Sequence, residues 1–143
     1  MPTARPRSDP IQIVVAAVRC GGQICVARRS QSVATSQGQW SVVTGYLEAE
    51  TDPEQQAWSE LNEELGLAPP ELILRRRLDP VPLTSPASGK VFLVHPFLFD
   101  SRSSTVVLNW EHDAVQWVDP TWLDQPGCVP WQAELVRALL ADE

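Results

Sequence analysis

Gly45–Leu67 (GYLEAETDPEQQAWSELNEELGL) is the stretch that decides the fold, because a glycine turn in it leads into a helix that ends in glutamates. Asp52 is a good N-cap, Pro53 suits the first helical position, and Gln55 completes an Asp-x-x-Gln capping box. Gly66 supplies the left-handed residue that commonly ends a helix. These signals predict a helix between Asp52 and Gly66.

The charge of this helix is unbalanced. Glu60, Glu63 and Glu64 fall within an arc of roughly 100°, at about 100° per residue. An apolar stripe lies beside them, made of Ala57, Leu61 and Leu65. No Lys or Arg occurs from Ser30 to Leu74, so nothing nearby in the sequence neutralises the acids.

A solvated acidic face is the usual interpretation of such a helix, but it does not explain this placement. Unrelieved like charges at these spacings cost about 0.2–0.5 kcal/mol per pair. Acids near a helix C-terminus also oppose the helix dipole by about 0.3–1 kcal/mol each. A hard divalent cation explains the placement, since Mg²⁺ binds a few carboxylate oxygens and uses its remaining positions for water and substrate phosphates.

The order of residues in this stretch resembles the signature box of the Nudix hydrolases. That box reads glycine, five residues, Glu, seven residues, Arg-Glu-aliphatic-x-Glu-Glu-x-Gly-aliphatic. It matches without a gap at Gly45, Glu60-Leu61, Glu63-Glu64 and Gly66-Leu67. Two positions depart from the pattern, because Thr51 stands in place of the first Glu and Ser59 in place of the Arg.

The two departures bear on catalysis. In Nudix hydrolases the Arg commonly braces the loop and the helix by pairing with acidic residues of the box, including the first Glu. Losing one partner alone strands a charge, which is expensive in a partly buried site, whereas losing both is self-consistent. Thr51 and Ser59 could be joined by a weaker hydrogen bond, or Glu50 could take over part of the missing acid's role.

The resemblance also implies roles for the acids. Glu60 and Glu64 are the expected metal ligands, with Glu63 a further ligand or a base, and the expected cofactor is Mg²⁺, with Mn²⁺ possible. Such a site supports attack by activated water on a diphosphate bond. Many relatives recruit another acid from a later loop, and Glu111 and Asp113 are the candidates here, alongside the alternative of an ordinary polar loop. The catalytic candidates are therefore Glu60, Glu63 and Glu111.

Substrate contacts are expected from three basic residues and one aromatic residue, namely Arg28, Arg29, Arg75 and Tyr46. The arginines can meet phosphate oxygens by charge-assisted hydrogen bonds, although Arg75–Arg77 also suit an edge strand protected by charge. Four aromatic residues either stack a base or belong to the core: Trp40, Tyr46, Trp110 and Trp117. We interpret His112 as a loop or hydrogen-bonding residue and His95 as structural.

Composition is typical of one small globular domain. The chain has 143 residues, of which 43% are hydrophobic and 20% charged. The net charge of −7 argues against binding polymeric nucleic acid, whose phosphates are met by basic surfaces, but a small nucleotide-type substrate screened by a metal remains compatible. Three cysteines and two histidines favour neither a disulfide framework nor a zinc site.

The expected domain organisation is a flexible tail over residues 1–10 and a single Nudix-like domain over residues 11–143. The tail lacks the apolar core of a signal peptide. The apolar run Ile11–Val18 is too short to cross a membrane, which needs about 20 residues. We therefore expect a cytoplasmic protein without a membrane segment, and a homodimer is possible because such domains are often dimers.

The remaining elements predict a mixed sheet between helices, the α/β/α sandwich that the resemblance implies. A closing amphipathic helix is expected at Trp131–Leu140, with Leu135, Ala138 and Leu139 facing inward. A loop is expected at Pro82–Gly89 and a turn or short helix at Pro120–Leu123. Strands are expected at Ile11–Arg19, Gln23–Arg28, Trp40–Val43, Leu72–Val81, Lys90–Phe99 and Ala114–Val118.

Three hypotheses of function follow. The first is a divalent-metal-dependent pyrophosphohydrolase that cleaves a diphosphate bond in a nucleoside diphosphate linked to another group, such as a nucleotide, ADP-ribose or a nucleotide sugar. The alternative is a catalytically weak or inactive module that binds nucleotide or ADP-ribose, motivated by Thr51 and Ser59. A third is an interaction domain with a merely acidic helix, which predicts no metal-dependent shift in melting temperature.

Overall fold

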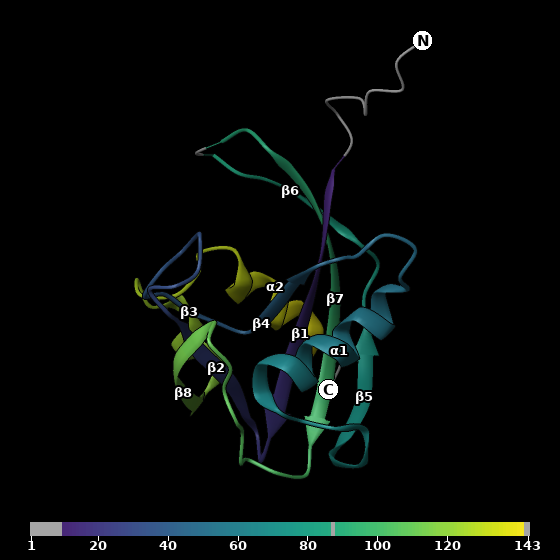
Figure 1. Ribbon diagram of the computed structural model, residues 1–143, viewed down its shortest axis with the longest axis vertical. Helices are drawn as coiled ribbons and strands as arrows, with labels where there is room; N and C mark the ends of the chain where they lie inside the picture. Colours follow the sequence, from purple (N-terminus) through teal and green to yellow (C-terminus); the bar gives the residue numbers. More distant parts are fainter. Residues whose placement is uncertain (1–9, 87, 142–143) are drawn as a thin grey trace.

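The computed structural model describes residues 10–86 and 88–141, which form a mixed sheet covered by one helix on each face (Figure 1). Helix α1 (Pro53–Leu65) lies on one face and α2 (Gln132–Leu140) on the other. The predicted α/β/α architecture is confirmed. The strands are β1 (Ile11–Cys20), β2 (Gln23–Arg29), β3 (Trp40–Ser41), β4 (Val43–Tyr46), β5 (Leu72–Arg77), β6 (Val81–Thr84), β7 (Val91–Ser101) and β8 (His112–Val118), with short 3₁₀ helices η1 (Pro69–Glu71) and η2 (Pro120–Asp124).

Strands β1 and β7 form the parallel centre of the sheet, and every other pairing among the described strands is antiparallel. The main order is β3-β2-β1-β7-β5, while β4 pairs with β1, β6 with β7 and β8 with β2. A central parallel pair is covered on both faces. This position explains why β1 contains the continuous buried run Val14–Val18.

Alternate residues of the central strands supply two separate cores. Val15 and Ala17 pack towards α2, in a cluster that includes Leu135, Val136 and Leu139. Val14 and Ala16 pack towards α1, in a cluster that includes Ala57, Leu61 and Leu65. The apolar stripe predicted on α1 is confirmed, because its three members are fully buried.

The ends of α1 are fixed by the residues that the sequence indicated. The side chain of Asp52 accepts hydrogen bonds from the backbone N–H groups of Glu54 and Gln55, and Pro53 occupies the first turn. Gly66 ends the helix in the left-handed region with φ 68°. The reciprocal half of the capping box, from the side chain of Gln55, is not formed among the described residues.

Two predicted strands are divided in the structure, and both predictions were wrong in extent. The expected strand Leu72–Val81 ends at Arg77, and β6 begins at Val81 as an edge strand paired with β7 within the expected loop Pro82–Gly89. Prolines are compatible with such an edge position. The expected strand Trp40–Val43 is interrupted at Val42, whose N–H donates to Oε1 of Gln132 in α2 at 2.7 Å.

The inward face of α2 also differs from the prediction. Leu135 and Leu139 are buried as expected, but Ala138 is exposed and the burial continues to Ala133 and Val136 instead. The helix begins one residue later than expected, at Gln132, which is itself fully buried because its amide bonds the backbone of Trp40 and Val42. The buried apolar face of α2 therefore consists of Ala133, Leu135, Val136 and Leu139, without Ala138.

The predicted tail over residues 1–10 lies outside the described residues except for Pro10. Within residues 10–86 and 88–141, no helix combines the length and the apolar character that crossing a membrane requires.

Candidate functional site

A polar stripe on α1 forms the centre of the site. Gln56, Glu60 and Glu64 follow one another at intervals of one helical turn, next to the apolar stripe that packs on the sheet. Glu60 is 8% exposed and Glu64 only 1% exposed. Two carboxyl groups are thus buried side by side on a helix whose last turn contains no basic residue.

Gly45 makes room for Glu60. Gly45 lies in β4, and a Cβ atom added to it would stand 2.4 Å from Cδ of Glu60. Any side chain at this position would therefore displace the carboxyl group. The glycine is required by this close approach, since its φ is outside the left-handed region.

The two buried carboxyl groups act on each other's pKa. Burial, followed by the interaction with Glu60, raises the pKa of Glu64 to about 10. Burial also raises the pKa of Glu60, although its interactions with Glu64 and Gln56 act in the opposite direction. In the metal-free protein at neutral pH, Glu64 therefore keeps its proton.

His112 completes this buried cluster. Its Nδ1 lies 3.7 Å from Oε1 of Glu64, and burial lowers the pKa of the imidazole below its ordinary value. A β-bulge brings it there, because Arg28 pairs with Ala114 while Arg29 pairs with His112, so that Asp113 is the extra residue.

The loop before β8 carries Glu111, the predicted additional acid. The carbonyl oxygens of Trp110 and Glu111 accept hydrogen bonds from the hydroxyl and the N–H of Ser30, both at 2.8 Å. Asn109 accepts from the N–H of Glu111 and donates to its carboxylate. The charge of Glu111 contributes to raising the pKa of both Glu60 and Glu64, so this acid lies near the buried pair.

Glu63 is placed differently from its two neighbours, because its side chain is exposed. Across residues 10–86 and 88–141, no group of three or more His, Cys, Asp or Glu side chains is already arranged to hold a metal ion. The buried pair itself fits a cation, since Oε2 of Glu64 has no hydrogen-bond partner among the described residues. A divalent cation bound by both carboxylates would replace the proton that Glu64 keeps.

The three candidate arginines are dispersed. Arg29 is the one whose charge lowers the pKa of Glu64, and its Nε donates to the carbonyl of Thr35 at 2.9 Å. Arg28 pairs with Asp113 at 2.7 Å and lies over the ring of Trp40. Arg75 pairs with Asp100 at 3.1 Å on β5, at the opposite end of the main strand order from β2 and β3.

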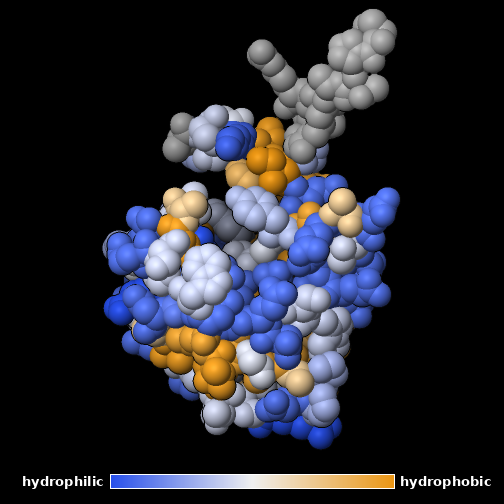
Figure 2. Space-filling view, viewed as in Figure 1, coloured by the Kyte–Doolittle hydropathy of each residue, from blue (hydrophilic) through white to orange (hydrophobic). Residues whose placement is uncertain are grey.

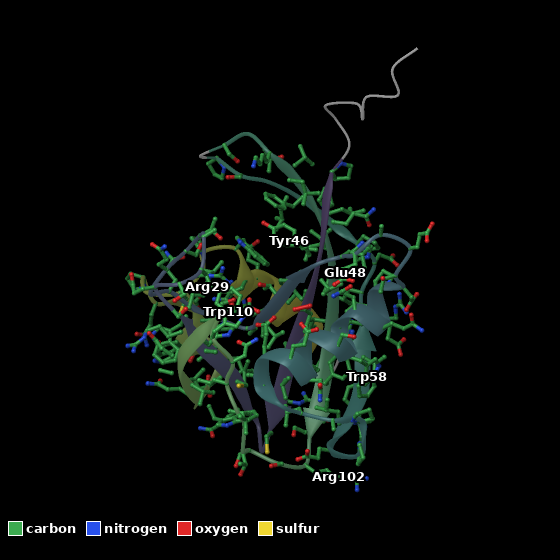
Figure 3. The ribbon with its side chains drawn as sticks, viewed as in Figure 1. Arg29, Tyr46, Glu48, Trp58, Arg102 and Trp110 are labelled. Carbon is green, nitrogen blue, oxygen red and sulfur yellow. The ribbon has the colours of Figure 1, made fainter. Side chains whose placement is uncertain are left out.

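The aromatic candidates divide into two pairs. Trp40 and Trp117 are half-buried and pack against the two cores. Tyr46 and Trp110 are each 66% exposed. Trp110 directly precedes Glu111, and its carbonyl is bonded by Ser30, the neighbour of Arg29 (Figure 3). Tyr46 pairs with Ile13, which packs in the α2 cluster, so its side chain leaves β4 on the face opposite to Gly45. Figure 2, drawn in the same view, shows a largely hydrophilic surface that is hollowed beneath the β6–β7 hairpin.

A family model for the NUDIX domain matches residues 10–139, which include the whole of the site described above. The chain belongs to the Nudix family. The Nudix resemblance of Gly45–Leu67 is therefore confirmed. A comparison with curated proteins found no match.

Solved Nudix structures share the fold of this chain at low sequence identity. The MutT protein from Methanosarcina mazei Go1 is 21% identical, with a TM-score of 0.74 over 94% of this chain and 96% of the other. An Ap4A hydrolase from C. elegans, described as a binary complex, is 18% identical, with a TM-score of 0.71 over 90% and 96%. The NUDIX domain of Shewanella oneidensis NrtR, complexed with ADP ribose, is 14% identical, with a TM-score of 0.70 over 93% and 86%. These identities show the fold alone.

The two departures from the Nudix box are not joined to each other. Ser59 is exposed, and the hydroxyl of Thr51 lies 3.4 Å from the carbonyl of Ala49, so no hydrogen bond links these residues within the described chain. Glu50 is also exposed, with φ 61°. Two residues of the site were not predicted from the sequence: Gln56, which contacts Glu60, and His112, which was interpreted only as a loop or hydrogen-bonding residue. The signal for Gln56 was its position one turn before Glu60. The signal for His112 was its position next to Glu111.

Proposed function

We propose that this Nudix protein is a divalent-metal-dependent pyrophosphohydrolase that cleaves a diphosphate bond in a nucleoside diphosphate linked to another group. The observation that carries the proposal is the buried pair Glu60 and Glu64, in which Oε2 of Glu64 is left without a hydrogen-bond partner among the described residues. Burying a second carboxylate is costly unless a proton or a cation neutralises it. Mg²⁺ is the expected cation, with Mn²⁺ possible.

In this proposal each acid has a separate task. Glu60 and Glu64 hold the cation, and Glu63, which is exposed, is a further ligand or a base. The cation, when bound, neutralises charge on the phosphates and lowers the pKa of water. Glu111 accepts a proton, because its half-buried carboxylate lies near the pair and is held by Asn109.

The substrate class is supported by the surroundings of the acids. Trp110 is exposed next to Glu111 and Tyr46 is exposed at the end of β4, and each offers an aromatic surface to a base. Arg29 offers a positive charge for phosphate near Glu64. An Ap4A hydrolase and an ADP-ribose complex among the structural neighbours support a nucleotide-type substrate.

A substrate panel tests the proposal. Nucleoside triphosphates, ADP-ribose, nucleotide sugars and dinucleoside polyphosphates are incubated with Mg²⁺ or Mn²⁺ and the wild-type protein, Glu63→Gln or Glu64→Gln. Wild type should hydrolyse at least one class, and Glu64→Gln should lose most of that activity. Glu134→Gln, an exposed substitution on α2, is the matched control. Hydrolysis by wild type no faster than by Glu64→Gln across the panel would contradict catalysis.

The second candidate is a binding module without turnover, favoured by the missing link between Thr51 and Ser59. It predicts metal-assisted binding of ADP-ribose or a nucleotide with no product, and a gain of hydrolysis in Thr51→Glu/Ser59→Arg. Calorimetric titration of ADP-ribose in the presence of Mg²⁺, with product analysis of the same sample, separates the two candidates. The melting temperature with and without Mg²⁺ tests the third, the interaction domain.

A further inference from the structure

Gln56 is a buried polar residue one turn before Glu60 on α1. It is 4% exposed, although its side chain carries an amide. Burying an amide is costly unless its donors and acceptor find partners. The residues that satisfy Gln56 therefore indicate what holds it in place.

Both ends of the Gln56 amide are used. Oε1 accepts a hydrogen bond from the backbone N–H of Glu48 at 3.2 Å, and Nε2 donates to Oε2 of Glu60 at 3.0 Å. The orientation of the amide follows from chemistry, because a backbone N–H can only donate and therefore requires the amide oxygen. The amide nitrogen is then directed at the carboxyl group of Glu60.

The bond to Glu48 fixes the loop that precedes the helix. Leu47 donates its N–H to the carbonyl of Gln12 in β1 at 2.9 Å, and Thr51 donates to the carbonyl of Glu48 at 3.2 Å. Glu48 therefore lies between the end of β4 and the turn that leads into α1. Through this residue, Gln56 connects the loop to a carboxyl group of the helix.

Glu60 is confined from two sides. Gly45 stands so close that an added Cβ would lie 2.6 Å from Oε1 of Glu60, while Gln56 holds Oε2. Gln56 is uncharged, so it restrains the carboxyl group without neutralising it. The negative charge of Glu60 then remains available to a cation.

We propose that Gln56 is a positioning residue, which ties the Glu48 loop to Glu60 and holds that carboxyl group beside Glu64 in the arrangement that receives a cation. Only the part of this proposal that concerns a cation rests on the proposed function. The two hydrogen bonds of Gln56 are present without a cation. Second-sphere partners of this kind typically change metal affinity or activity by about 10–100-fold.

Hydrogen exchange of the Glu48 amide tests the tie without any metal. Gln56→Met keeps the length of the side chain and removes both hydrogen bonds, and Gln55→Met makes the same change at the exposed neighbour. The Glu48 amide should be protected in the wild type and in Gln55→Met but exchange at least about 10-fold faster in Gln56→Met. Equal exchange rates of the Glu48 amide in all three proteins would overturn the claim that Gln56 holds the Glu48 loop. If Gln56→Met does not fold, Gln56→Asn replaces it, because the asparagine side chain is too short to reach both partners.

Metal affinity tests the effect on Glu60. Mn²⁺ binding measured by electron paramagnetic resonance should weaken by about 10–100-fold in Gln56→Met, and kcat should fall more than KM rises. Gln55→Met should match the wild type, and unchanged Mn²⁺ affinity in Gln56→Met would overturn the positioning role. One further outcome is that the wild type binds no Mn²⁺ while the Glu48 amide still exchanges faster in Gln56→Met. In that case the proposed function would fail, but the link between Gln56 and the Glu48 loop would stand.

Discussion

Nδ1 of His112 lies 3.7 Å from Oε1 of Glu64, and both side chains are almost completely buried. The contact is not an ion pair in the metal-free protein, because burial lowers the pKa of the histidine and raises the pKa of the acid. It is also too long for a hydrogen bond, and Nδ1 has no other partner among the described residues.

Replacing His112 with Phe should therefore leave the stability of the metal-free protein nearly unchanged or raise it, since an unpaired buried polar atom is removed. His95→Phe is the control, because Nε2 of His95 is paired with Oε1 of Gln12 at 2.8 Å. That control should lose about 0.5–1.5 kcal/mol. Urea unfolding in EDTA measures both variants, and a loss in His112→Phe larger than in His95→Phe would contradict the unpaired state of Nδ1.

The metal-free protein should become less stable as pH rises. The pKa of Glu64 is raised from 4.5 to about 10, so the folded protein keeps a proton that the unfolded chain releases within this window. The free energy of unfolding then falls with rising pH, by up to about 1.4 kcal/mol per pH unit for one proton. Urea unfolding in EDTA between about pH 7 and pH 9 measures how the free energy of unfolding changes with pH. This range lies above the titration of His112, because burial lowers the pKa of that imidazole below 6.5.

The pH slope has its own controls. Glu64→Gln removes the titrating group and should flatten the slope, whereas Glu63→Gln changes an exposed acid of the same helix and should keep it. Saturating Mg²⁺ should also abolish the slope, because the cation takes the place of the proton. A wild-type slope that persists in Glu64→Gln would assign the effect to other groups.

Gly45→Ala should disturb the site selectively. The new methyl group would stand 2.4 Å from Cδ of Glu60, while the backbone at Gly45 is compatible with alanine. Overpacking of this kind costs about 1–3 kcal/mol, and the displaced carboxyl group should also weaken Mn²⁺ binding. Gly127→Ala is the matched control, because its nearest neighbour would be 4.0 Å away. Wild-type Mn²⁺ affinity and stability in Gly45→Ala would contradict the close contact.

Removing either of the exposed aromatic residues Tyr46 and Trp110 should raise KM. Tyr46→Ala and Trp110→Ala each remove a stacking surface, and base stacking contributes about 1–3 kcal/mol, which corresponds to roughly 5–150-fold. Steady-state kinetics with the substrate that the panel identifies should show this rise with kcat little changed. Ile73→Ala, an exposed apolar substitution on β5, should keep the wild-type KM. If Tyr46→Ala and Trp110→Ala both kept it too, base stacking would be excluded.

The sequence was sufficient to predict α1 because its determinants are local. Asp52 and Gly66 fix the ends of the helix, and the spacing of Ala57, Leu61 and Leu65 fixes which face packs. The same spacing places Glu60 and Glu64 one turn apart, so their proximity could be predicted as well. The order of the predicted strands and helices, together with the Nudix resemblance, likewise indicated the mixed sheet between helices.

The remaining features depend on contacts between distant parts of the chain. Burial of Gln56 requires the backbone of Glu48 as a partner, and burial of Gln132 requires the backbone of Trp40 and Val42. Neither contact leaves a local pattern. The exposure of Glu63, in contrast to Glu60 and Glu64, depends on where the sheet lies relative to the helix, which the acidic spacing alone does not specify.

The bulge at Asp113 makes the site depend on the number of residues in β8 as well as on their types. Val115 and Trp117 pack on the α1 side of the sheet, so strict alternation would place Asp113 on that side and turn His112 away. Deleting one residue here would thus exchange the faces of every residue before the deletion while leaving the strand's composition almost intact. An alignment that shifts by one position in this strand would pair residues that point to opposite helices.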